Sequence, residues 1–479
     1  MCYNIFCLYM RFFVEDVPCR RVETMRILVI GDGKVGHTLV EHLAQEGHDV
    51  VIIDSNDEVL ERTQDTLDVM CIRGNGANAQ TLMDAGAKKA DIIIAATASD
   101  ETNMLCCLIG KRMGAKYSIA RIRDPEYNES LSMLRHELDI DMAINPERAT
   151  AVEIGHLLRF PFAANVESFA RGRVEMVGFR AQEGDPFIGL PMKDISRELK
   201  GIPQVLYALV EREGQVMIPV GDFSIRPGDL VHVAGDSITI TNYFRYLGKS
   251  SVKIKDVMLL GGGRISYYLA RILVPTGTRV SMIEIDQKKA EQLSEALPEV
   301  NVIYGDGTDQ ELLEQEGLRQ MDAFVTLSNR DEENLMTGLF AVKQGVPKVI
   351  VKNNRVAYAD LIGSLGLDSV VSPRSVTCAN ILRYVRARAN SGEGTMVEKL
   401  HRLVGGKAEA LEFTAKAGDP YIGIPLKDLN RRKNTLVAVI VRQRQVIVPF
   451  GGDHIEAGDT VIIMACESGI SDLNEVIRK

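Results

Sequence analysis

Short apolar runs alternate with amphipathic stretches over two long parts of this chain. In the first part, residues 27–30, 50–53, 69–72 and 91–96 form apolar runs of strand length, with apolar residues at helical spacing between them. Strands that alternate with helices predict a doubly wound parallel sheet. The same alternation returns later in the chain, where four more strands are expected: 257–260, 280–283, 302–304 and 323–327.

A different pattern follows each of these parts. Shorter strand candidates surround polar turns such as Pro227-Gly228-Asp229, which is typical of a small mixed α+β domain. The candidates are residues 205–210, 216–218 and 230–233, and then 436–441, 446–448 and 460–464. We call each such region a cap.

The chain repeats itself. Residues 26–36 match residues 256–266 at an offset of 230, and residues 184–191 (Gly-Asp-Pro-Phe-Ile-Gly-Leu-Pro) match residues 418–425 (Gly-Asp-Pro-Tyr-Ile-Gly-Ile-Pro). The sequence therefore predicts an α/β protein with two tandem copies of a Rossmann-like doubly wound sheet domain followed by a cap. The expected boundaries are 25–148 and 254–375 for the sheet domains, and 160–246 and 396–479 for the caps.

Residues 1–24 do not belong to this pattern, because an expected strand begins directly after Met25. We expect Met25 to be the natural start, preceded by a non-native extension that is disordered or loosely packed.

A glycine-rich loop joins the first expected strand to the first expected helix. A glycine triplet in this context is a dinucleotide fingerprint, in which the glycines allow a tight turn, backbone approach to a diphosphate and close packing of the helix. Asp54, at the end of the second strand, is suited to bind a ribose diol. A purely structural Rossmann domain is the alternative. The candidate nucleotide contacts are Gly31, Asp32, Gly33, Lys34, Val35, Gly36 and Asp54.

The second copy departs from this fingerprint. Ser266 replaces the third glycine, and Glu284 takes the place of Asp54. Arg264, at the helix start, is a candidate phosphate ligand. The alternative is a degenerate site that is kept for its fold. The candidate contacts here are Gly261, Gly262, Gly263, Arg264, Ile265 and Glu284.

Further candidates lie in loops that follow other strands, where ligands collect in open α/β sheets. Asn75 and Asp306 are placed to face an adenine, and Thr97 and Ser328 to bond a phosphate or a ribose. Ordinary turn chemistry explains these residue types equally well. Arg121 is expected to reach a nucleotide phosphate or an acidic neighbour at a subunit contact, or to form a surface ion pair.

Composition excludes several classes of protein. The net charge is −9, from 56 Lys and Arg against 65 Asp and Glu, which argues against nucleic-acid binding. No apolar run approaches the length of a membrane-spanning helix. The 8 cysteines and 8 histidines show no metal-ligand spacing and no catalytic motif. We therefore expect no catalytic residues, no metal and no enzyme activity.

On these residues the duplicated unit resembles the regulator-of-potassium-conductance family, and the tandem arrangement resembles the peripheral subunits of Trk potassium-uptake systems. The motifs that carry the resemblance lie at residues 97–104, 120–125 and 305–313. The resemblance implies NAD(H), or ATP and ADP, in the sheet domains. It also implies a tetrameric ring of identical chains at the inner face of the cell membrane, under a potassium-transporting subunit of the TrkH or TrkG kind.

The resemblance also implies nucleotide contacts at Ala98 and Asn329, besides those already named. The exchange of Arg121 for Lys352 in the second copy weakens the second set. Two alternatives stay open from the sequence: an NAD-dependent oxidoreductase, and a regulatory module of a different ion transporter.

Overall fold

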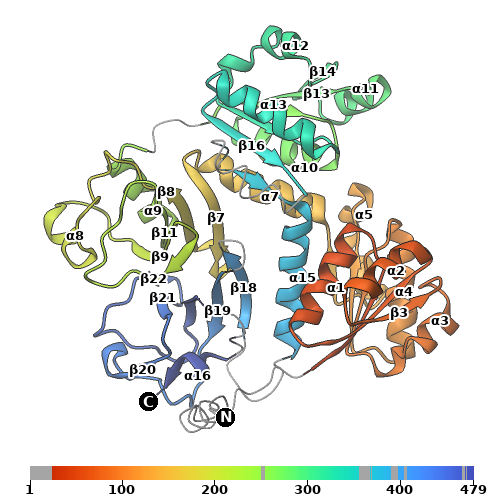
Figure 1. Ribbon diagram of the computed structural model, residues 1–479, viewed down its shortest axis with the longest axis horizontal. Helices are drawn as coiled ribbons and strands as arrows, with labels where there is room; N and C mark the ends of the chain where they lie inside the picture. Colours follow the sequence, from red (N-terminus) through yellow and green to blue (C-terminus); the bar gives the residue numbers. More distant parts are fainter. Residues whose placement is uncertain are drawn as a thin grey trace, which may run out of the picture.

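The computed structural model describes residues 24–249, 254–354, 367, 369–389, 397–403, 407–466, 470 and 472–478. These residues form two parallel sheets and two large antiparallel sheets, which build four lobes (Figure 1). The fold class expected from the sequence is confirmed. The expected extension before Met25 falls on residues that lie, except for residue 24, outside the described part.

The first parallel sheet has the strand order β3-β2-β1-β4-β5-β6, which is the order of a doubly wound sheet. Strand β1 is central, and its residues from Ile27 onward are buried, because helices cover both faces. The strands are β1 (Arg26–Ile30), β2 (Asp49–Asp54), β3 (Met70–Arg73), β4 (Ile92–Ala95), β5 (Tyr117–Arg121) and β6 (Met142–Ile144); the helices are α1 (Lys34–Gln45), α2 (Asp57–Thr66), α3 (Ala79–Asp84), α4 (Asp100–Met113), α5 (Pro125–Glu129) and α6 (Leu131–Glu137).

The second parallel sheet repeats this order as β14-β13-β12-β15-β16-β17. In both sheets the expected strands are present with small shifts at their ends, and two more strands extend one edge. The strands are β12 (Asp256–Leu260), β13 (Arg279–Glu284), β14 (Asn301–Tyr304), β15 (Ala323–Thr326), β16 (Lys348–Lys352) and β17 (Val370–Val371); the helices are α10 (Arg264–Leu273), α11 (Gln287–Ala296), α12 (Gln310–Gln315) and α13 (Asp331–Lys343).

The caps contain antiparallel sheets with matching strand orders, β10-β9-β11-β8-β7 and β22-β21-β23-β19-β18. The first cap has β7 (Ala163–Phe169), β8 (Val174–Arg180), β9 (Leu206–Arg212), β10 (Gln215–Met217), β11 (Leu230–Asp236), α8 (Met192–Glu198) and α9 (Ser237–Tyr246). The second has β18 (Val397–Leu403), β19 (Ala408–Thr414), β21 (Thr435–Arg442), β22 (Gln445–Ile447), β23 (Thr460–Ala465) and α16 (Leu473–Val476), with a small ladder of β20 (Asn430–Arg431) and β24 (Ile477–Arg478).

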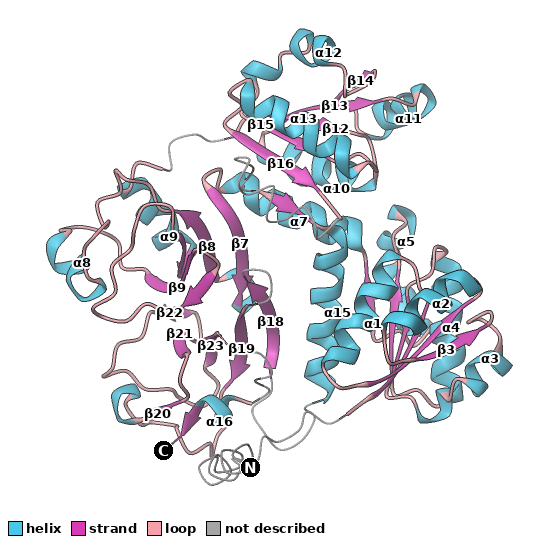
Figure 2. Ribbon diagram, viewed as in Figure 1, coloured by secondary structure: helices cyan, strands magenta, loops and turns pink. Residues whose placement is uncertain are grey.

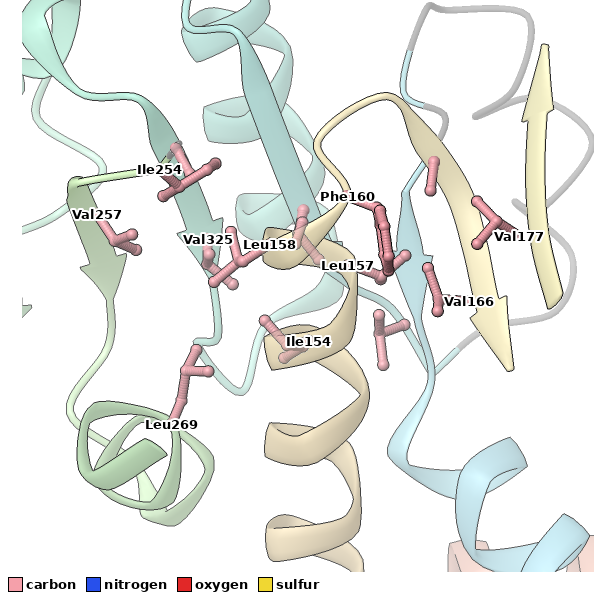
Figure 3. Packing of buried hydrophobic residues seen from close by; sticks show 14 of the residues in the cluster. Ile154, Leu157, Leu158, Phe160, Val166, Val177, Ile254, Val257, Leu269 and Val325 are labelled. Atoms are coloured by element: carbon pink, nitrogen blue, oxygen red, sulfur yellow. The ribbon is translucent and has the colours of Figure 1, made fainter. Parts of the chain in front are cut away.

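A long helix leaves each parallel sheet toward its own cap, and each of these helices packs on the sheet domain of the other copy. We call α7 (Pro146–Arg159) and α15 (Pro373–Ala389) the crossover helices. Ile154 and Leu157 of α7 belong to the same apolar core as Leu269 and Val325 of the second sheet domain (Figure 3). Conversely, α15 lies beside α1, and its buried residues join the core of the first sheet domain (Figure 1).

The two caps pack against each other through one face of each sheet. Strands of the two caps lie side by side (Figure 2). Phe169, Met176 and Leu209 of the first cap share a core with Val439 and Met464 of the second. The two copies are therefore joined at the caps and through both crossover helices.

Candidate nucleotide sites

The three glycines of the first loop have different structural roles. Gly31 has φ +98°, a conformation that favours glycine, and an added Cβ there would lie 3.0 Å from the backbone of Thr97. At Gly36 an added Cβ would lie 1.8 Å from the carbonyl oxygen of Gly31, because the helix packs tightly on the turn. Gly33 has open space where a side chain would be. Backbone approach by a ligand is therefore unobstructed at the middle glycine.

The first helix presents an open N-terminus next to this loop. Gly33 is the N-cap of α1, no side chain accepts a hydrogen bond from the first turn, and that turn holds no acidic residue. By contrast, Asn56, Asn78 and Ser99 cap α2, α3 and α4 of the same domain with their side chains. Free N–H groups and the helix dipole suit an anion such as a diphosphate. Lys34 is exposed and Val35 half-buried at this end.

Asp54 is held at the carboxyl end of β2, beside the loop. Its carboxylate accepts hydrogen bonds from the backbone N–H of Asp32, at 2.6 Å, and of Asn56, at 2.9 Å. A carboxylate has about four acceptor positions, and the Asp54 side chain is only half-buried. Acceptor capacity therefore remains for the two hydroxyls of a ribose.

The Asp32 side chain is buried beside α1 and α2. Thr63 donates to its carboxylate at 2.5 Å, and the Nδ1 atom of His37 lies 2.9 Å from the Thr63 hydroxyl. Burial raises the pKa of Asp32, and the Thr63 hydrogen bond acts against that rise. Both the backbone N–H and the side chain of Asp32 are thus engaged within the domain.

The loop after β4 is organised by a residue that the sequence reasoning assigned no role. Asn103 is fully buried, and its side chain accepts from the Thr97 N–H, at 2.8 Å, and from the Thr97 hydroxyl, at 2.7 Å. It also donates to the carbonyl oxygen of Arg121, at 2.9 Å. The Thr97 hydroxyl is therefore engaged within the loop, while Ala98 is exposed at its tip. The signal was the recurrence of Asn at the matching position 334.

Asn75 and Asp306 serve their own turns. The Asn75 side chain accepts from the N–H of Ala77, at 2.9 Å, and Asp306 accepts from the N–H of Thr308, at 2.9 Å, and from its hydroxyl, at 2.8 Å. These bonds hold the pKa of Asp306 below its usual value. Both side chains are exposed next to their glycines, so turn chemistry and ligand contact are compatible.

Arg121 connects the first site to a crossover helix. Its guanidinium lies 3.4 Å from the carbonyl oxygen of Thr97 and 3.8 Å from the Glu147 carboxylate in the first turn of α7. Burial lowers the pKa of Arg121, and Glu147 acts against that change. The Nε of Arg121 and one carboxylate oxygen of Glu147 are buried without a hydrogen-bond partner. Sequence reasoning missed Glu147, which reaches the site only because α7 starts there.

The second glycine loop keeps the geometry of the first. Gly261 has φ +96°, and Gly263 is the N-cap of α10 without a side-chain hydrogen bond, followed by the buried Ile265. Ser266 is fully buried, and its hydroxyl donates to the carbonyl oxygen of Gly261. The serine therefore fits at the third glycine position by bonding to the turn. At Gly262 an added Cβ would lie 2.4 Å from the Leu293 side chain and 2.9 Å from the Glu284 carboxylate, so a larger residue there requires these side chains to move.

Glu284 is more enclosed than Asp54. It is 5% exposed and accepts from the N–H of Gly262, at 2.9 Å, from the N–H of Asp286, at 3.0 Å, and from the Lys289 ammonium, at 2.5 Å. These partners hold its pKa below the usual value, although burial acts in the opposite direction. The carboxylate expected to bind a ribose in the second copy is thus paired with a cation of its own domain.

Other second-site candidates also lie around the loop. Ser328 donates its backbone N–H to the side chain of Asn334, at 2.9 Å, as Thr97 does to Asn103 in the first copy. Lys352 is buried, and its ammonium lies 3.3 Å from the carbonyl oxygen of Leu327 and 3.4 Å from the side chain of the exposed Asn329. Burial lowers the pKa of Lys352.

Arg264 points toward the first copy. Its guanidinium lies 4.0 Å from the Asp124 carboxylate, which belongs to the first sheet domain. Nearby, the Tyr268 hydroxyl of α10 donates to the carbonyl oxygen of Arg123, at 3.2 Å, and accepts from Asn145, at 3.0 Å. The start of α10 is thus bound to the first sheet domain.

Within the described residues there is no cluster of His, Cys, Asp and Glu that could hold a metal ion. No helix in that part of the chain is long and apolar enough to span a bilayer.

Comparison with known proteins matches both halves of the chain to one family. The TrkA-N domain model matches residues 27–146 and 257–373, and the TrkA-C domain model matches residues 410–478. The Trk system potassium uptake protein TrkA homolog 1 of Methanosarcina mazei is 32% identical over 462 residues, which are 95% of this chain and 100% of the relative. The TrkA protein of Vibrio alginolyticus is 32% identical over 461 residues, 95% and 99% of the two chains.

Solved structures share the fold. The GsuK channel superposes with a TM-score of 0.62 at 18% identity, which covers 95% of this chain and 79% of that one. The GsuK RCK domain superposes with a TM-score of 0.60 at 18% identity, with 92% of each chain covered.

Proposed function

Because this chain belongs to the TrkA family of Trk system potassium uptake proteins, we propose that it is a nucleotide-binding regulatory subunit that gates a separate, membrane-embedded potassium transporter. The observation that carries this proposal is the reciprocal packing of the crossover helices. Each helix that starts at a glycine loop, α1 or α10, packs against the crossover helix of the other copy. A ligand at either loop therefore acts on an element that joins the two copies.

The proposed ligands are NAD(H) and the adenine nucleotides ATP and ADP. The GsuK channel bound to NAD shares this fold, with a TM-score of 0.60 at 18% identity. In this chain the open N-terminus of α1 suits the diphosphate, and Asp54 suits the ribose. Nucleotide binding without turnover is the proposed activity.

Regulation follows from differential affinity. A nucleotide shifts the subunit between two arrangements only if it binds one of them more tightly. A path for this coupling runs along α1. Its C-cap Glu46 pairs with Arg386 of α15, at 2.8 Å, and Arg386 also pairs with Glu409 of the second cap, at 3.2 Å. A change in the position of α1 is therefore transmitted to the crossover helix and to the cap.

We propose further that identical chains assemble into a tetrameric ring at the inner face of the cell membrane. Leu105 of α4 and Met336 of α13 occupy matching positions in the two copies and are 46% and 66% exposed. An apolar side chain that is exposed at the same place in both copies suits a repeated contact between chains.

The test is potassium uptake by cells that lack their own subunit. Gly33→Asp should abolish nucleotide-dependent uptake, because the new carboxylate faces the diphosphate position, where a side chain meets no protein atom. Gly452→Asp is the matched control, since Gly452 also has open space and the first copy has Asp222 at that position. Normal nucleotide-dependent uptake with Gly33→Asp would refute the proposed function.

A further inference from the structure

The two candidate sites differ most at the edge where a ribose would lie. Asp54 is half-buried and accepts hydrogen bonds from two backbone N–H groups. Glu284 is almost completely buried and accepts from two backbone N–H groups and from the Lys289 ammonium, at 2.5 Å. The carboxylate at this edge is therefore paired with an ammonium group in the second site, whereas the carboxylate of the first site is bonded to backbone N–H groups.

The matching residue in the first copy is Val59. Val59 and Lys289 are each the third residue of the helix after the ribose carboxylate, α2 and α11, and both are partly buried. The residues before them, Glu58 and Lys288, are exposed and have opposite charge. The second site thus has two cations where the first has an anion and an apolar residue.

One further charge in each site opposes this contrast: a cation, Arg73, in the first site and an anion, Asp286, in the second. Both side chains are already bonded to other groups. In the first site, Arg73 pairs with Asp57 at 2.6 Å. In the second site, the Asp286 carboxylate caps α11 by accepting from the backbone N–H of Lys289, at 3.0 Å. Neither pairing removes the contrast between Glu58 and Lys288 or between Val59 and Lys289.

We propose that the second site binds an adenine dinucleotide whose ribose carries a 2′-phosphate, with Lys289 and Lys288 as its cationic partners, whereas the first site binds an unphosphorylated ribose diol. This inference rests on nucleotide binding as proposed above. A phosphate dianion gains charge-assisted hydrogen bonds from the two ammonium groups of the second site. Glu284 takes the place of Asp54 in the second site, but its charge is offset by the paired Lys289. In the first site, Asp54 and Glu58 repel the phosphate.

Two probes isolate the 2′-phosphate. 5′-AMP and adenosine 2′,5′-bisphosphate differ in that group alone, and calorimetry on the full chain measures both. The wild-type chain should bind 5′-AMP at both sites and the bisphosphate at the second. Lys289→Val, which installs the residue of the first copy, should weaken bisphosphate binding about tenfold or more. 5′-AMP should bind this variant at least as tightly, because Glu284 loses a competing cation.

The reciprocal double change, Glu58→Lys together with Val59→Lys, should create bisphosphate binding at the first site. Lys289→Met, which keeps an unbranched flexible side chain but removes its charge, should reproduce the loss, and thermal unfolding checks that each variant is folded. The inference is overturned if 5′-AMP binds but the bisphosphate does not, or if Lys289→Val leaves bisphosphate affinity unchanged. Failure of both 5′-AMP and NAD⁺ to bind would instead overturn the proposed function, and with it this inference.

Discussion

Truncation of one buried isoleucine in each crossover helix tests whether the helices stabilise the opposite sheet domains. Ile154 and Ile381 are each the ninth residue of their helices, and they are 0% and 1% exposed. Ile154 lies in the core of the second sheet domain and Ile381 in that of the first. Each substitution by alanine should cost about 2–5 kcal/mol, from lost burial and the cavity that remains.

The assay is amide hydrogen exchange, followed strand by strand. Ile381→Ala should speed exchange about 30-fold or more in the first sheet, because 1.4 kcal/mol corresponds to a factor of ten. Its main effect should fall on β1, β2 and β4, although the substitution is in the second copy. Ile154→Ala should have its main effect on β12, β13 and β15.

The control is Ile238→Ala, an exposed isoleucine of α9 that is 74% exposed, for which we expect a change within about 0.5 kcal/mol. The reasoning would be refuted if Ile381→Ala loosened the second sheet more than the first, or if both crossover variants loosened both sheets equally.

Four more predictions concern single residues and the N-terminus. Asp54→Ala should weaken adenine-nucleotide binding at the first site by about 1.5–3 kcal/mol, measured by calorimetry, because a charge-assisted hydrogen bond to the ribose is lost; unchanged affinity would contradict the assignment. Arg386→Ala should lower the free energy of unfolding, measured with denaturant, by about 3–5 kcal/mol, because the carboxylates of Glu46 and Glu409 lose that cation. A loss below about 1 kcal/mol would argue against a role of Arg386 in coupling. Burial raises the pKa of Asp32 in the folded state above its pKa in the unfolded state. The contribution of Asp32 to folding stability therefore falls as the pH rises from the unfolded-state pKa through the folded-state pKa. Asp32→Asn should remove this part of the pH dependence of the melting temperature, and identical pH profiles for the variant and the wild type would contradict the prediction. A chain that starts at Met25 should fold and bind nucleotide as the full chain does, and failure to fold would show that the extension contributes to stability.

Much of the local structure could be predicted because its signals are local. The central strands of both parallel sheets are buried on two faces, so they are unbroken apolar runs, and β1 and β12 each begin one residue before the expected start and end where expected. Gly31 is required by its positive φ angle, and Gly36 is required because a Cβ there would clash with the carbonyl oxygen of Gly31. Both requirements arise within six residues of sequence. The assignment of nucleotide contacts to this loop stays a prediction.

Several parts of the sites depend on contacts between distant segments. Glu147 reaches Arg121 only because the crossover helix starts beside β5, and Arg264 lies near Asp124 only because α10 packs on the first copy. Asn103 holds the loop after β4 from within α4, although its sequence context is that of an ordinary first helical turn. Nothing in the spacing of these residues predicts such contacts.

The sequence by itself determined the duplication, the two kinds of domain in each copy and the glycine loops, because periodicity and backbone requirements act over a few residues. It did not determine which sheet each crossover helix covers. The apolar faces of α7 and α15 would suit either sheet, since burial of apolar surface has no direction. The tertiary structure decided this by placing Ile154 on the second sheet and Ile381 on the first, and this exchange connects the two candidate nucleotide sites.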